Sequence, residues 1–161
     1  MALKKSASRS KTPDAIALLK ADHRQVEQWF AQFDKSSSKS KKQQLADSIC
    51  EALTIHTTIE EEIFYPAFLQ ATRDKDTHHE AVVEHAGAKK LISEIQDMSS
   101  DDDFFDAKVT VLSEMIKHHV KEEEQAGGMF AEAKKSKMDL QQLGEQLALR
   151  KQELQSQPKA A

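Results

Sequence analysis

The stretch "IHTTIEEEIFYP", residues 55–66, places a histidine four positions before a glutamate, at the point where a helical face becomes apolar. His56 and Glu60 would lie one turn apart on that face, because residues four apart are neighbours on a helix. A charged carboxylate that is buried without a partner is very costly. The stretch therefore predicts that other segments bring matching groups to the same depth.

Apolar residues recur at steps of three and four on both sides of this stretch, which indicates a succession of helices. The predicted helices run from a Thr12 cap through Phe33, from about 42 to 71, from about 77 to 98, from a serine cap at 99–100 to Gly127, and from about 138 to 155.

The composition agrees with a helical protein of one domain. The 161 residues suit a single core, and with only 4 glycines and 3 prolines the chain has few helix breakers. Helices of this length with short connections predict an all-α, antiparallel four-helix bundle with an additional C-terminal helix. The predicted parts are a disordered basic tail over 1–11, the bundle over 12–135, and a C-terminal helix over 136–157 that packs on the bundle or extends from it.

The net charge, the hydropathy and the cysteine content of the chain disfavour several partners and locations. A net charge of −4 gives no reason to propose nucleic acid, and no apolar run is long enough to span a membrane. The basic start lacks the apolar segment of a secretory signal. The single cysteine, Cys50, excludes an intrachain disulfide, and its place in an amphipathic pattern is typical of a small buried hydrophobe. These features predict a cytoplasmic protein.

Each of the four long predicted helices carries polar groups in phase with its apolar stripe. The set is His23, His56, Glu60, His85, His119 and Glu123. A single histidine of this kind is usually a hydrogen-bonded core residue, but here the pattern recurs in all four helices. Facing imidazoles repel when protonated, and buried carboxylates need positive charge. A bound cation meets both needs, so the sequence predicts a metal site.

The donor types narrow the choice of metal. Imidazole and carboxylate without thiolate suit iron, manganese or zinc better than calcium, magnesium or copper(I). Two carboxylates among several histidines can bridge two ions, as helical bundles commonly arrange.

The helical register of the fourth predicted helix shows which of its two adjacent histidines faces the core. His119 continues the spacing of Leu112 and Ile116, whereas His118 lies about 100° away around the helix. His119 is therefore the expected ligand, and His118 is expected to flank the site or support a ligand.

Other groups near the predicted site have less certain roles. His78 lies two turns before His85 and could reach a metal from the start of its helix. His78, His118 and Tyr65 are possible additional ligands or supporting groups, and the same three are the nearby candidates for proton delivery. The remaining acids of the two glutamate runs are interpreted as solvated helix face: Glu61, Glu62, Glu122 and Glu124.

A family resemblance rests on these residues. They are His23, the run His56-x-x-x-Glu60-Glu61-x-Ile-Phe-Tyr-Pro, Glu84-His85, and "HHVKEEE" at 118–124. Together they resemble the hemerythrin-like HHE cation-binding domain over about residues 14 to 135. The resemblance implies a four-helix bundle around a non-haem di-iron centre, which two carboxylates and an oxo or hydroxo oxygen bridge. Dioxygen would bind at an open position on one iron.

The resemblance also assigns roles to the ligands. It implies that His23 and His56 bind one iron, and that Glu60 and Glu123 bridge. His85 and His119 would then bind the other iron, with manganese or zinc as substitutes.

The chain departs from the oxygen-carrying hemerythrins in two places. They have a histidine one turn before the ligand that His85 resembles, and this chain has Ala81 there. They also space histidine and aspartate by five in the fourth helix, whereas His119 and Glu123 are four apart. A missing imidazole leaves an open or water-filled position, which favours redox reactivity or sensing over reversible oxygen carriage.

The leading functional hypothesis is therefore a di-iron protein that binds or senses dioxygen or a related small oxidant, rather than a dedicated enzyme. One alternative is an enzyme that consumes peroxide or nitric oxide at the open iron. Another is an iron-handling or regulatory module whose output element is the helix at 138–155. A protein partner or a homodimer is compatible with each hypothesis.

Overall fold

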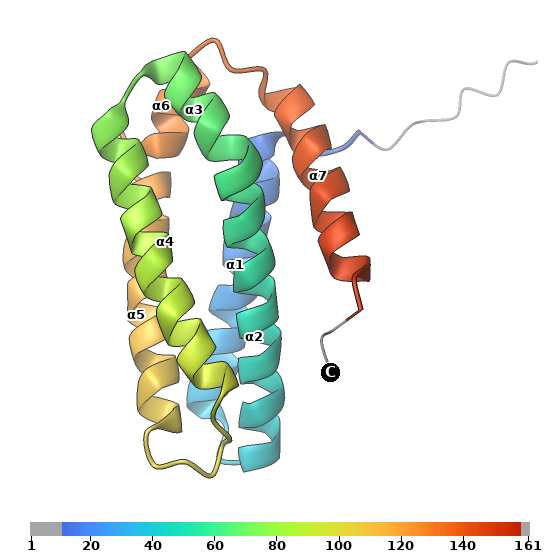
Figure 1. Ribbon diagram of the computed structural model, residues 1–161, viewed down its shortest axis with the longest axis vertical. Coiled ribbons are helices and arrows are strands. Elements are labelled where there is room, and N and C mark those ends of the chain that lie inside the picture. The colour runs from blue at the N-terminus through green and yellow to red at the C-terminus, as the bar shows by residue number, and fades with distance from the viewer. Residues whose placement is uncertain (1–10, 159–161) are drawn as a thin grey trace, which may run out of the picture.

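The computed structural model describes residues 11–158, and the regular structure within them is helical (Figure 1). The elements are α1 (Ala15–Lys35), α2 (Lys39–Ile59), the π-helical turn η1 (Glu60–Phe64), α3 (Tyr65–Thr72), α4 (Lys75–Gln96), α5 (Phe105–Glu124), α6 (Met129–Lys135) and α7 (Leu140–Ser156). Helices α1, α2, α4 and α5 form an antiparallel bundle, and α7 lies along its outside. The predicted fold class is confirmed. The predicted basic tail lies outside the described residues except for Lys11.

Two predicted helix caps were wrong. The side chain that caps α1 is Asp14, which accepts a hydrogen bond from the amide of Ala17 at 2.8 Å, and not Thr12. Helix α5 begins at Phe105 without a side-chain cap. The acids before it are used within the preceding loop, where Asp102 accepts a hydrogen bond from the amide of Ser99 at 2.8 Å. Short polar side chains serve loops as readily as helix starts.

The second predicted helix contains a π-helical turn that the sequence did not reveal. Helix α2 passes directly into η1 and α3, and the amide of Tyr65 donates to the carbonyl of Glu60, five residues back. Pro66 follows immediately and has no amide hydrogen to donate, so the α-helical pattern is already interrupted here. Five positions in an α-helix end about 140° beyond a full turn, whereas a π turn closes them into roughly one turn. The turn thus places Glu60 and Tyr65 on one face.

Two apolar clusters fill the bundle, and a layer of buried histidines and glutamates lies between them. This layer is called the polar layer below. One contains Phe30, Ile49, Phe105 and Leu112, together with Cys50, whose interpretation as a buried hydrophobe is confirmed. The other contains Leu19, Phe64, Phe68, Phe130 and Leu147. On α1, α2 and α4 a histidine lies between the residues of one cluster and those of the other. None of the helices in the described part of the chain combines the length and apolarity that crossing a membrane requires.

The last two helices cover one end and one side of the bundle. The short α6 was not predicted, and it contributes Met129 and Phe130 to the second cluster. Helix α7 buries Leu143 and Leu147. It crosses the start of α1 at Gly144, where the backbones of the two segments are in close contact.

We expect Gly144→Ala to displace α7. A Cβ atom at this position would lie 2.3 Å from the carbonyl oxygen of Pro13 and 2.7 Å from the carbonyl carbon of Asp14. Neither atom belongs to a flexible side chain, so we expect a loss of about 1–3 kcal/mol in the free energy of unfolding. Denaturant unfolding and limited proteolysis of α7 measure the change.

Gly87→Ala is the matched control. Its Cβ would meet only the terminal methyl of Met115, at 3.1 Å, and that flexible side chain can move. Wild-type stability and an equally protease-resistant α7 in Gly144→Ala would show that the close approach is not required.

Candidate metal centre

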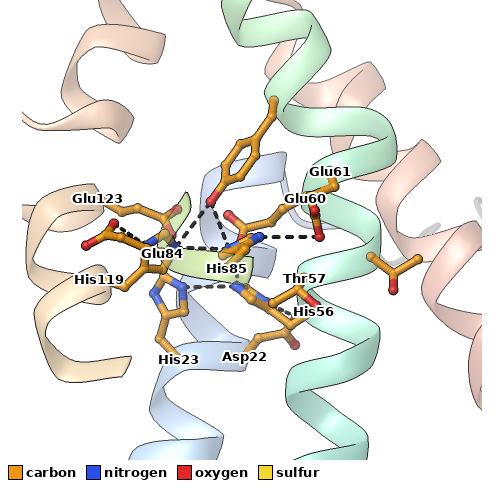
Figure 2. Close-up of polar contacts among 12 residues, drawn as sticks. Asp22, His23, His56, Thr57, Glu60, Glu61, Glu84, His85, His119 and Glu123 are labelled. Carbon is orange, nitrogen blue, oxygen red and sulfur yellow. Dashed lines mark hydrogen bonds and ion pairs between the residues drawn. The ribbon is translucent and has the colours of Figure 1, made fainter. Parts of the chain in front are cut away.

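The polar layer of the bundle contains all six residues that the sequence predicted as ligands (Figure 2). They are His23 from α1, His56 from α2, Glu60 from η1, His85 from α4, and His119 and Glu123 from α5. None of the six is more than 5% exposed. The bundle thus brings imidazoles and carboxylates from four separate segments of the chain to one depth.

The four imidazoles form two pairs that meet through their Nε2 atoms. The Nε2 atoms of His23 and His56 are 3.2 Å apart, and those of His85 and His119 are 3.1 Å apart. Glu60 lies between the pairs, because its Oε1 is 2.8 Å from Nε2 of His56 and 3.4 Å from Nε2 of His85.

The second carboxylate also reaches both pairs. Glu123 contacts Nε2 of His119, and its carboxylate belongs to both groups of side chains whose donor atoms lie close enough to share a metal ion. In one set it joins Glu60, His85 and His119, and in the other it joins His23 and His56, with donor atoms within 4.8 Å of one another. Two carboxylates between two imidazole pairs are a geometry suited to two neighbouring cations.

An outer carboxylate faces the other ring nitrogen, Nδ1, of each histidine. The pairs are His23 with Glu124 at 2.6 Å, His56 with Asp22 at 2.9 Å, His119 with Glu84 at 2.8 Å, and His85 with Glu61 at 3.5 Å, the last being longer than a hydrogen bond. An Nδ1–H that donates to a carboxylate leaves Nε2 to bind a metal and fixes the orientation of the ring.

A nitrogen-bearing side chain lies beyond each of these outer carboxylates. Lys151 contacts Asp22 at 2.5 Å, Lys89 contacts Glu61 at 2.5 Å, His118 contacts Glu84 at 3.2 Å, and Arg24 contacts Glu124. The interpretation of Glu61 and Glu124 as solvated helix face was therefore wrong. Asp22 and Glu84 were not singled out as part of the site.

The charges of the layer perturb its protonation. Burial opposes a charged imidazole, but Glu60 and Asp22 outweigh it and raise the pKa of His56 to about 10. Burial and the charge of His56 lower the pKa of His23 to about 4. Burial and the neighbouring Glu60 raise the pKa of Glu123 to about 8. Without a metal, protons therefore supply part of the positive charge that the layer needs.

These residues fit a bound cation. The carboxylate oxygens of Glu60 and Glu123 are buried and, among residues 11–158, face imidazole nitrogens rather than backbone or hydroxyl donors. A buried acceptor without a firm donor is costly, and a metal ion satisfies it while displacing the bound protons. The donor set of imidazole and carboxylate without thiolate suits iron, manganese or zinc.

Tyr65 belongs to the same layer. Its hydroxyl is 3.0 Å from Nε2 of His85 and 3.2 Å from Nε2 of His119, and the residue is 1% exposed. Burial and the nearby Glu60 raise the pKa of its hydroxyl well above the usual range, so the group stays protonated. The sequence suggested Tyr65 only as a neighbour, because it did not reveal the π turn that directs this side chain inward.

The other two histidines considered from sequence lie differently. The side chain of His118 is 61% exposed and contacts Glu84 from outside the layer. His78 is half-buried, with its ring centroid 6.2 Å from that of Tyr65, and does not join either group of candidate ligands.

Two small cavities adjoin the layer. One of about 20 Å³ is bordered by all four histidines and by apolar side chains that include Leu53, Ala88 and Ile116. The other, of about 100 Å³, touches His119, Glu123 and Ala81, and its lining reaches the exposed Glu80 and the half-buried Glu122. Space therefore lies at Ala81, where the resembled family has an imidazole.

Comparisons with known proteins agree with this site. A solved structure of a hemerythrin HHE cation binding domain-containing protein from Mycobacterium kansasii superimposes with a TM-score of 0.74, at 22% identity, over 88% of this chain and 87% of that chain. A protein of Nostoc sp. named DNA nickase is 29% identical over 107 residues, which are 66% of this chain but only 30% of that protein. The family model described as the hemerythrin HHE cation binding domain matches residues 14–127, and the chain belongs to that family.

Proposed function

We propose that the chain is a hemerythrin-like protein that binds two iron ions in the polar layer. In this proposal His23 and His56 hold one ion, His85 and His119 hold the other, and Glu60 and Glu123 bridge them. The observation that carries the proposal is the ordered layer itself, in which four Nε2 atoms surround two buried carboxylates while each Nδ1 faces an outer carboxylate. Manganese or zinc would fit the same donors.

We further propose that dioxygen or a related small oxidant is the ligand of this centre. When bound, iron supplies redox chemistry and an open coordination position. The cavity bordered by the four histidines limits the size of the ligand. Its volume is about 20 Å³, enough for a molecule about the size of one water. Its apolar border of Leu53, Ala88 and Ile116 favours a small uncharged molecule.

The test is a metal count followed by spectroscopy. Protein purified from an iron-replete host should contain about two irons per chain, as the two imidazole pairs require. Anaerobic reduction followed by exposure to air or peroxide should change an absorption band in the near-ultraviolet or visible range. Protein that contains no metal would refute the metal site, and metal-loaded protein whose spectrum is the same in both states would refute the oxygen chemistry.

A second function, consumption of peroxide, is favoured by the place of Tyr65. Breaking an oxygen–oxygen bond requires protons, and this hydroxyl lies 3.0 and 3.2 Å from two candidate ligand nitrogens, in the interior of the bundle. A positioned proton donor typically contributes about 10²–10⁴-fold to a rate.

We expect Tyr65→Phe to reduce peroxide turnover of the iron-loaded protein by about 100-fold while its iron content stays unchanged. His78→Phe is the control, since His78 lies near Tyr65 but outside both groups of candidate ligands. Initial rates of peroxide loss, with iron counted in the same samples, measure the effect. Full turnover in Tyr65→Phe would exclude the tyrosine, and stoichiometric reaction without turnover in the wild type would exclude the enzyme.

Other expectations about partners and location stay predictions. The name DNA nickase describes the Nostoc protein as a whole, and the matched part is less than a third of it. We therefore carry no action on DNA over to this chain. The expectation that nucleic acid is not a partner still rests on the net charge of −4.

A further inference from the structure

Helix α7 lies beyond the matched range of residues 14–127, yet it contacts the polar layer. Nζ of Lys151 is 2.5 Å from Oδ1 of Asp22, and Oδ2 of the same carboxylate is 2.9 Å from Nδ1 of His56. One carboxylate thus divides its two oxygens between α7 and a candidate metal ligand.

The other three histidines do not depend on α7 in this way. Their outer carboxylates are held by Lys89 of α4, Arg24 of α1 and His118 of α5. These three side chains belong to the bundle itself. His56 is therefore the candidate ligand whose outer support comes from outside the four long helices.

The packing around Lys151 makes its contact with Asp22 important for the position of α7. A cavity of about 360 Å³ lies between α1, α2 and α7, and is lined by Val26, Trp29, Leu53 and Lys151 among others. The buried apolar contacts of α7, Leu143 and Leu147, lie nearer its start. Beyond Leu147 the apolar contacts of α7 come from the partly buried Ala148 and Leu154, and the polar contact of Lys151 adds to them at this level. The Asp22 side chain is only 13% exposed, so this pair is less screened than a surface ion pair.

The neighbouring Arg150 offers a contrast on the same helix. Its guanidinium contacts Glu62 at 2.7 Å, and the Glu62 side chain is 46% exposed. This pair also joins α7 to the bundle, through a surface carboxylate instead of one that holds a histidine. If ion pairs merely fasten α7, the two should be equivalent.

We propose that Lys151 is a positioning residue for His56. It fixes the rotation of the Asp22 carboxylate, which accepts the Nδ1–H of His56 and thereby aims Nε2 into the layer. The inference rests on the proposed metal centre, and it makes retention of metal at the His23–His56 pair depend on the docking of α7.

The experiment compares Lys151→Met with Arg150→Met, since methionine keeps an unbranched apolar stem at each position and removes the charge. The protein is loaded with Fe²⁺ without air, and transfer of the metal to a chelator is followed in time. We expect one phase of release to accelerate about tenfold in Lys151→Met, the lower end of the usual effect of removing support behind a metal ligand. Arg150→Met and the charge-conserving Lys151→Arg should release metal as the wild type does.

A double variant tests whether the effect passes through Asp22. In Asp22→Asn the carboxylate is already lost, so adding Lys151→Met should change release no further. Equal release from Lys151→Met and the wild type, equal acceleration in Arg150→Met, or a further acceleration in the double variant would each overturn the proposal.

A second readout separates this inference from the metal centre. The Nδ1–H resonance of His56, observed by NMR in metal-free and Zn²⁺-loaded protein, should broaden in Lys151→Met as the proton exchanges faster with water, and stay sharp in Arg150→Met. A wild type that binds neither Fe²⁺ nor Zn²⁺ would refute the proposed function. An unchanged resonance in Lys151→Met would refute the positioning role whether or not metal binds.

Discussion

Replacement of Glu60 by glutamine should abolish tight iron binding, while the metal-free protein should keep its fold. Glu60 is fully buried, and its Oε1 is 2.8 Å from Nε2 of His56 and 3.4 Å from Nε2 of His85. Glutamine has the same shape but is neutral and has one acceptor oxygen, so it cannot bridge two cations. In the absence of metal the substitution breaks the buried pair with His56, so we expect a folded protein of lower stability than the metal-free wild type.

The two effects are separated by thermal unfolding with and without iron, together with a metal count. At a free iron concentration 100 times the dissociation constant, binding adds about 2.7 kcal/mol to the stability of the wild type. For a chain of this size that raises Tm by roughly 5–10 °C. We expect this increase to disappear in Glu60→Gln.

Glu62→Gln is the control, because it removes the same charge from the same run at a side chain that is 46% exposed. It should keep the full iron content and the full increase in Tm. A Glu60→Gln protein that also kept both would show that this carboxylate is not a ligand.

Replacement of His119 by leucine should remove one of the two proposed metal ions, whereas the same change at His118 should leave both in place. The two residues are adjacent in sequence, but His119 is 5% exposed with Nε2 in the layer, and the side chain of His118 is 61% exposed. Leucine fills much of the volume of the imidazole and donates nothing to a metal. We expect the affinity for the second ion to fall by more than about 100-fold, beyond the usual effect of losing a supporting group.

Iron content per chain and titration with Fe²⁺ under anaerobic conditions measure this difference. The His118→Leu protein serves as the matched control for the added apolar side chain. Equal loss of iron in both variants would mean that the outer contact of His118 with Glu84 matters as much as ligation. Equal retention would remove His119 from the site.

The six inward residues of the layer could be predicted because they obey helical periodicity. His56 and Glu60 repeat the spacing of His119 and Glu123, and each continues an apolar stripe. A buried polar residue in phase with a core is visible in the sequence whatever the helices pack against. The all-α bundle followed from the same periodicity.

The outer carboxylates could not be predicted, because their roles depend on how the helices pack. Asp22 is adjacent to His23 in the chain but accepts from His56 on α2. Glu84 is adjacent to His85 but accepts from His119 on α5. A side chain one position away from an inward residue points about 100° aside, toward the neighbouring helix. The identity of that neighbouring helix is known only once the bundle is assembled. The periodicity of a single helix carries no information about it.

The inserted residue of η1 has a consequence for the tolerance of this segment to change in length. The π turn accommodates one extra residue, and it sets which way each side chain of α3, from Tyr65 to Thr72, points. Deleting one of Glu61, Glu62 or Ile63 would leave Tyr65 four positions after Glu60, and a regular α-helix would then keep the phenol and the buried ring of Phe68 on their present faces. The segment should therefore tolerate the loss of one residue, whereas the loss of a second would turn both rings by about 100° and disturb the polar layer and the apolar packing beside it at once.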